Sequence, residues 1–243
     1  MIRLDQRDGI AWLTIDRGGA RNAFDLAGWR SLSDAVARIA ADSRAVILCS
    51  ADAASFSAGA DISEIAANRL TPDWPERFLG DMRDAIDGVA ALPMPVIAAI
   101  DGGCFGAAVA LMLAADMRIG GEGARFAVTP ARLGLLYPAI DVRRLIAAVG
   151  RGQASRLLLT GDAIDAAEAA RTGLIEQVVP NALDAAQAIA ERIAANKPGA
   201  VAGLKALLRN PAPAIHDAAF LDALSGKELG EGLAGFAARK GRR

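Results

Sequence analysis

Few residues of this chain could bind a metal ion or form a disulfide. Its 243 residues include two cysteines and one histidine. Cys49 and Cys104 lie in apolar runs, and His216 stands far from both in the sequence. Protein metal sites need several converging donor side chains, so we expect no metal site. The cysteines are expected to be buried, reduced thiols, as in a cytoplasmic protein.

The chain also lacks a large net charge and a long apolar run. It has 27 Lys and Arg residues against 28 Asp and Glu residues, a formal net charge of −1. This balance gives no electrostatic footprint for nucleic acid or an anionic membrane. The longest uncharged run, residues 102–115, is shorter than the roughly 20 residues that cross a bilayer. The first residues do not resemble a signal peptide, so we expect a cytoplasmic protein with no nucleic-acid or membrane partner.

The distribution of apolar residues predicts an α/β protein. Apolar residues make up 53% of the chain and charged residues 23%, as expected for a folded globular protein. A composition shift near Pro180 predicts a mixed α/β core over residues 1–180 and an all-helical region over residues 181–243. Strands are expected at 2–16 (a hairpin turning at Asp8-Gly9), 45–49, 95–100, 116–119, 125–128 and 175–179, and helices at 26–40, 76–92, 108–116, 142–149, 152–159, 163–171, 183–196, 200–208 and 217–239.

The most informative stretch, residues 95–116, reads PVIAAIDGGCFGAAVALMLAAD. An apolar run is followed by a turn of glycine and alanine and then by an apolar segment too long for a second strand, which predicts strand, tight turn and buried helix. Residues 102–108 leave backbone N–H groups uncovered at a helix start, where an anionic oxygen can bind. The stretch FSAGADI, residues 56–62, has the same small-residue character. Two such turns facing each other would form an oxyanion hole; close helix packing alone is the alternative.

These two stretches, together with LLLTGDAIDAAEAARTGLIEQVV at residues 157–179, resemble the enoyl-CoA hydratase/isomerase family, also called the crotonase superfamily. The resemblance covers about residues 10–179 and continues more weakly in EGLAGFAARK near the C-terminus. It implies a spiral of ββα units with a C-terminal helical trimerisation region, assembled as a homo-trimer or hexamer. It also implies an acyl-CoA substrate and no tightly bound cofactor, coenzyme A being part of the thioester.

The resemblance also assigns binding residues. The oxyanion hole corresponds to the backbone N–H groups of Ala60 and Ala107, which would stabilise an enolate next to the thioester carbonyl. Coenzyme A would lie against Ala20, Arg21, Ala58, Asp61 and Ile62. Asp61 also lies at the start of an expected helix, so a structural role is the alternative to contact with coenzyme A. Phe236 and Arg239 would reach the coenzyme A of a neighbouring subunit, which would give the basic end of the chain a phosphate partner instead of leaving it solvated.

The chain departs from the family where proton transfer is expected. Family hydratases use two glutamates to deliver water and a proton, and the matching positions here are Ala110 and Pro130. Asp141 lies where some family isomerases place their single acid, with a surface or capping aspartate as the alternative. Tyr137 lies where some family decarboxylases carry a tyrosine, with a packed aromatic as the alternative. Arg132 and Arg143 could pair with a carboxylated acyl group or with neighbouring carboxylates.

Three functions therefore stay open. The first is an acyl-CoA enzyme of the hydratase/isomerase type that uses Asp141, alone or with Tyr137; a single acid suits moving a double bond better than adding water. The second is a decarboxylase-like enzyme in which the oxyanion hole does most of the work. The third is a non-catalytic acyl-CoA-binding or assembly protein.

Overall fold

The computed structural model describes residues 1–209 and 213–240, with backbone only at 213–216 and 238–240. The chain opens with the predicted antiparallel hairpin, β1 (Ile2–Arg7) and β2 (Ile10–Ile15). Asp8 and Gly9 have φ angles of 51° and 73°, the left-handed values that a tight two-residue hairpin turn requires.

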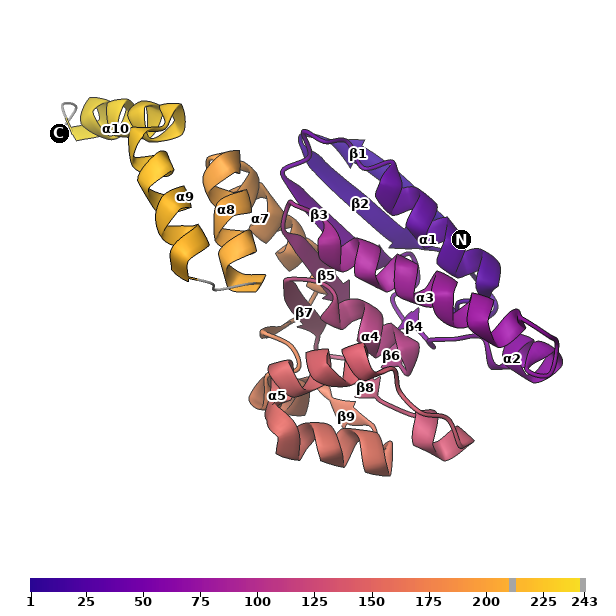
Figure 1. Ribbon diagram of the computed structural model, residues 1–243. Helices are drawn as coiled ribbons and strands as arrows, with labels where there is room; N and C mark the ends of the chain where they lie inside the picture. The colour runs from indigo at the N-terminus through magenta and orange to yellow at the C-terminus, as the bar shows by residue number, and fades with distance from the viewer. Residues whose placement is uncertain (210–212, 241–243) are drawn as a thin grey trace.

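After helix α1 (Leu26–Ala37), a unit of two strands followed by helix repeats along the chain. The first strand of each unit joins a six-stranded sheet of order β1-β2-β3-β5-β7-β10, and the second joins a four-stranded sheet of order β4-β6-β8-β9. Successive units pair in parallel, so the expected spiral of ββα units is confirmed (Figure 1). The units are β3 (Ala45–Ser50), β4 (Ser55–Ser57), α2 (Ile62–Asn68) and α3 (Trp74–Ala91); β5 (Val96–Ile100), β6 (Gly103–Phe105) and α4 (Ala107–Leu113); and β7 (Met117–Gly121), β8 (Arg125–Ala127), the 3-10 turn η1 (Pro130–Leu133) and α5 (Ala139–Thr160).

Both faces of the larger sheet are covered. Every residue of β2 is buried, and alternate side chains along it join two different core clusters, as a sheet between two layers requires. Ala11 and Leu13 join the cluster that includes α1 and α3 residues. Ile10 and Trp12 join the cluster formed with three alanines of α7 (Ala182–Ala194), namely Ala182, Ala186 and Ala190. The last strand, β10 (Gln177–Val179), ends next to the expected boundary at residue 180; the two-domain division stays a prediction, and the helix after it packs on the core.

The last two helices, α9 (Pro213–Ser225) and α10 (Lys227–Lys240), extend away from the sheets, whereas α8 (Pro198–Arg209) lies closer to them (Figure 1). Lys205 fixes α8, because its buried Nζ donates to the Met94 carbonyl at 2.6 Å and lies 2.5 Å from an Asp116 carboxylate oxygen. Among the described residues, no helix is both long and apolar enough to cross a membrane. Large apolar side chains are exposed on these three helices, at Leu204, Leu208, Phe220, Leu221, Leu224, Leu229, Leu233 and Phe236.

The predicted elements differ from the structure at several places. The strands β4, β6 and β9 (Ile164–Asp165) were not predicted, because two or three residues are too short for a period-two pattern to be visible. For the same reason the predicted helix at 163–171 begins later, as α6 (Ala166–Thr172). Two helices predicted at 142–149 and 152–159 form α5, which is kinked at Gly150 (φ 74°). The helix predicted at 217–239 is two helices, α9 and α10, separated at Gly226.

Candidate functional site

Two small-residue turns meet at one edge of the four-stranded sheet. One turn connects β4 to α2, and the other connects β6 to α4. Because β4 and β6 are neighbouring parallel strands, their carboxyl ends lie at the same edge. The approach is so close that a Cβ atom on Gly59 would lie 2.4 Å from the Phe105 carbonyl oxygen and 2.8 Å from the Ala107 nitrogen. Gly59 also has a φ of 87°, so only glycine fits without strain.

Each turn presents a backbone N–H that its own secondary structure leaves free. Phe24 donates to the Gly59 carbonyl at 2.7 Å and accepts from the Asp61 N–H at 2.8 Å. In this parallel pairing the N–H of the residue between them, Ala60, points away from Phe24. Ala107 is the first residue of α4, and the N–H of that position has no acceptor within its helix. The structure therefore brings together Ala60 and Ala107, the two predicted donors.

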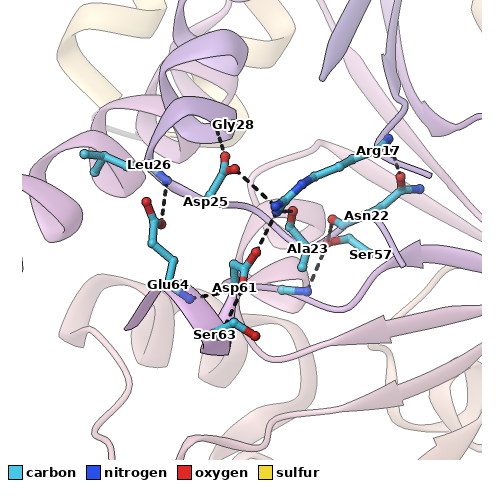
Figure 2. A network of polar contacts seen from close by, with 11 residues as sticks. Arg17, Asn22, Ala23, Asp25, Leu26, Gly28, Ser57, Asp61, Ser63 and Glu64 are labelled. Carbon is cyan, nitrogen blue, oxygen red and sulfur yellow. Dashed lines mark hydrogen bonds and ion pairs between the residues drawn. The ribbon is translucent and has the colours of Figure 1, made fainter. Parts of the chain in front are cut away.

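Figure 2 shows the polar network behind the first turn. The Arg17 guanidinium bridges two helix N-caps, lying 2.9 Å from Asp61 and 3.2 Å from Asp25. The Glu64 carboxylate, in the first turn of α2, accepts a hydrogen bond from the Leu26 N–H of α1 at 2.8 Å. These contacts tie the starts of α1 and α2 together, and thereby hold the backbone of the turn.

Asp61 therefore has a structural role, as its position at a helix start indicated. Its carboxylate accepts from the backbone N–H groups of Ser63 at 2.9 Å and Glu64 at 3.2 Å. Partial burial opposes its ionisation, but these backbone N–H groups and the Arg17 guanidinium outweigh burial and lower the pKa of Asp61. The predicted contact of Asp61 with coenzyme A stays a prediction.

A cleft of about 360 Å³ opens beside the two turns. Ala60 and Ala107 lie at its wall, and the side chains around them are mostly apolar. Trp74 and Phe78 are stacked, with ring centroids 4.9 Å apart. The apolar wall includes Ile65, Trp74, Phe78, Leu79, Met82 and Leu136, and the polar or charged side chains are Arg69, Thr129, Tyr137 and Asp141.

Asp141 is the one carboxylate that lines this cleft among the residues described. It lies in the first turn of α5 and is 2% exposed. Burial raises the pKa of Asp141, although Arg144, with its guanidinium 3.1 Å from the carboxylate, opposes the increase. Arg144 also pairs with Asp87 at 2.6 Å. Ala110 and Pro130, which the resemblance matches to the two glutamates, line the same cleft, and neither side chain can transfer a proton.

Tyr137 lies four residues before Asp141 and also lines the cleft. Its hydroxyl donates to the Gly106 carbonyl oxygen at 3.0 Å. Burial, followed by the nearby Asp141 charge, raises the pKa of Tyr137 well above its ordinary value. The hydroxyl therefore keeps its proton and is a hydrogen-bond donor.

The remaining predicted residues fall into separate groups. Ala58 and Ile62 line the cleft, and the Arg21 carbonyl accepts from the Ala58 N–H at 2.9 Å, which places the loop of Ala20 beside it. Phe236, on α10, is 62% exposed and does not line this cleft. The Arg239 side chain lies outside the described residues.

Other predictions concern ion pairs, thiols and metals. Arg132 pairs with Asp162 at 2.9 Å. For Arg132, pairing with a neighbouring carboxylate was the predicted alternative to binding a carboxylated acyl group. Both cysteines are buried and free, as predicted. No cluster of three or more metal-binding side chains occurs in the described part of the chain.

Sequence reasoning missed the pairing of Asp141 with Arg144 and the close approach at Gly59. A glycine directly before the predicted donor Ala60 was a signal for the second of these. The i,i+3 spacing of Asp141 and Arg144 at a helix start was a signal for the first. Nothing in the sequence marked the second partner of Arg144, because Asp87 lies 57 residues away and meets it only in the folded chain.

The sequence model of the enoyl-CoA hydratase/isomerase family matches residues 5–223. The chain is 33% identical over 210 residues to the 2,3-dehydroadipyl-CoA hydratase of Escherichia coli strain K12, covering 85% of this chain and 80% of that protein. Its structure resembles that of an enoyl-CoA hydratase from Bacillus anthracis, with a TM-score of 0.92 and 32% identity, covering 98% and 96% of the two chains. An enoyl-CoA hydratase/carnithine racemase from Magnetospirillum magneticum is also similar, with a TM-score of 0.91 and 33% identity, covering 98% and 92%.

Proposed function

Because the chain belongs to the enoyl-CoA hydratase/isomerase family, we propose that its cleft binds an acyl-CoA thioester and stabilises an enolate. The observation that carries this proposal is the contact of the two turns, which puts two free N–H groups at the wall of one cleft. An enolate oxygen gains more from such fixed donors than the neutral thioester carbonyl does. Each donor of an oxyanion hole contributes about 10²–10³-fold to the rate.

The walls of the cleft favour an apolar acyl group. Trp74, Phe78 and Leu79 come from α3, which forms one side of the cleft. Arg132, one candidate partner for a carboxylated acyl group, is already paired with Asp162. With the thioester carbonyl at the two donors, an apolar chain would lie along this side of the cleft. The coenzyme A part of the ligand would extend out of the cleft along Ala20, Arg21, Ala58, Asp61 and Ile62. Phe236 and Arg239 of another subunit would contact it.

Asp141 is the group that we expect to move the proton. Its carboxylate would take a proton from the carbon next to the thioester carbonyl of a 3-enoyl-CoA, giving a dienolate held by the two N–H groups. Returning the proton to the far carbon of the dienolate gives the 2-enoyl-CoA. Addition of water needs a second acid or base, and Ala110 and Pro130 provide none, so isomerisation should exceed hydration.

The helical C-terminal region would assemble the subunits. Eight large apolar side chains are exposed on α8, α9 and α10, and exposed apolar surface of this kind is typical of protein–protein contacts. This favours a homo-trimer or hexamer, as the family resemblance implies. Light scattering of the purified protein measures the mass directly, and a monomer at all concentrations would contradict the assembly.

The function is tested by measuring three reactions side by side: hydration of crotonyl-CoA, isomerisation of 3-hexenoyl-CoA and decarboxylation of a malonyl-type thioester. Isomerisation should be the fastest, and Asp141→Asn should reduce it about 10²–10⁴-fold, the usual contribution of a general base. Asp162→Asn is the matched control, because it also removes a carboxylate from an arginine, outside the cleft. If Asp141→Asn kept all of its activities, the choice of Asp141 as the base would be refuted. Absence of butyryl-CoA binding in calorimetry at millimolar ligand would refute thioester binding.

A further inference from the structure

The hydroxyl of Tyr137 contacts the peptide group that carries one of the two oxyanion donors. It donates to the Gly106 carbonyl oxygen at 3.0 Å. That carbonyl and the Ala107 N–H belong to the same peptide unit, one on each side of the C–N bond. The Gly106 carbonyl also accepts from the Val109 N–H at 3.0 Å, so both of its lone pairs are used.

We propose that Tyr137 is a positioning residue that strengthens the Ala107 N–H as an oxyanion donor by polarising the Gly106–Ala107 peptide. A hydrogen bond to the carbonyl oxygen draws electron density from the amide nitrogen through the conjugated peptide, which makes the N–H more positive. This is the cooperative effect known from hydrogen-bond chains. The proposal rests on the function proposed above, since it requires an anion at the Ala107 N–H.

The surroundings of the peptide support this role. Gly106 has a φ of 54°, and its own N–H donates to the Ala127 carbonyl at 2.9 Å. The Gly106 N–H fixes the peptide before Gly106, and two hydrogen bonds at the Gly106 carbonyl oxygen hold the Gly106–Ala107 peptide, while the Ala107 N–H stays free for a ligand. Tyr137 is partly buried and packs against the core. Because its pKa is raised by burial, the hydroxyl stays protonated across the working pH range.

The size of the effect follows from two known magnitudes. One oxyanion donor contributes about 10²–10³-fold. In a series of linked hydrogen bonds, each hydrogen bond strengthens the next by roughly 10–30%. If the logarithm of the donor's rate contribution changes by this fraction, the Tyr137 hydroxyl changes the rate by about two- to eightfold. A residue that transferred the proton itself would contribute about 10²–10⁴-fold, which separates the two roles.

The test measures enolate stability directly, with acetoacetyl-CoA as the probe. Its enolate absorbs in the near ultraviolet, so a pH titration of the bound ligand gives the pKa of enolisation on the protein. Tyr137→Phe removes the hydroxyl and keeps the ring. The control, Thr172→Val, removes a hydroxyl that donates to the Ala169 carbonyl at 3.1 Å, outside the cleft. Affinity for butyryl-CoA, which forms no stable enolate, reports whether the cleft is intact.

A second measurement works in the opposite direction without a mutation. Tyr137 is the only tyrosine in the chain, so protein produced with 3-fluorotyrosine is altered at this ring alone. Fluorination makes the hydroxyl a stronger donor. It should lower the enolisation pKa of bound acetoacetyl-CoA, whereas Tyr137→Phe should raise it by about 0.2–0.9 unit, the logarithm of the effect above.

The outcomes are distinct. Opposite shifts in the two proteins, with unchanged butyryl-CoA affinity and no shift in Thr172→Val, support the proposal. An enolisation pKa that is unchanged in both altered proteins overturns it, and so does a loss of turnover of more than about a hundredfold without a pKa change, which indicates proton transfer by Tyr137. If the wild-type protein itself does not lower the enolisation pKa, the oxyanion hole fails and this proposal fails with it.

Discussion

Replacing Gly59 with alanine should destabilise the protein and separate its two proposed oxyanion donors. The added Cβ would lie 2.4 Å from the Phe105 carbonyl oxygen and 2.8 Å from the Ala107 nitrogen, where favourable contacts need about 3.5 Å. Gly59 also has a φ of 87°, and an L-residue in that region costs about 1–2 kcal/mol. Overlap of this kind adds about 1–3 kcal/mol. The free energy of unfolding should therefore fall by about 2–5 kcal/mol.

The same change should reduce catalysis in the protein that remains folded. To relieve the overlap, the two turns must move apart by about 1 Å, and a misplacement of that size costs about a hundredfold in rate. Urea unfolding gives the stability, and isomerisation of 3-hexenoyl-CoA, normalised to folded protein, gives the rate.

Gly19→Ala is the matched control for backbone strain. Gly19 has a φ of 84°, but nothing lies within 4 Å of the added Cβ. The free energy of unfolding of Gly19→Ala should fall only by the cost of the left-handed conformation, about 1–2 kcal/mol. Its turnover should stay unchanged. If Gly59→Ala were folded and turned over within about twofold of the wild type, the two donors would not act together in an oxyanion hole.

Three further predictions concern ionised side chains. If Asp141 is the base, turnover should rise with pH through an apparent pKa above the ordinary aspartate value, because burial raises the pKa of Asp141. By linkage, the protonated carboxyl favours the folded state at low pH, and that contribution to stability is lost as the pH rises through the raised pKa. A pH-rate profile with no such limb would contradict the assignment. Arg17→Met should lower the free energy of unfolding by roughly 1 kcal/mol in thermal or urea melts, because Arg17 pairs with the Asp61 helix cap at 2.9 Å; an unchanged midpoint would show that the network in Figure 2 contributes no stability. Lys205→Met should cost up to about 3–5 kcal/mol, since it leaves Asp116 without its buried partner, and a loss below about 1 kcal/mol in urea would contradict that pairing.

The sequence by itself determined the type of fold and the places where the turns occur. Periodicity and turn chemistry reveal structure that depends on near neighbours in the chain. They marked the apolar strands β2 and β3, the Asp8-Gly9 turn and the two small-residue turns. The absence of a carboxylate at Ala110 and Pro130 is also visible in the sequence alone. Three short strands, β4, β6 and β9, were missed, since they are too short to show a period and β4 and β6 border the small-residue turns.

Only the tertiary structure decided how the site is assembled. The parallel pairing of β4 with β6 brings Gly59 against Ala107, although the two residues are far apart in the chain. The same packing buries Asp141 and directs the Tyr137 hydroxyl to the Gly106 carbonyl. Burial, donor distance and pKa depend on which segments meet in space, and local sequence patterns do not contain that information. The sequence therefore marked where an enolate could be stabilised, and the fold decided which side chains surround it.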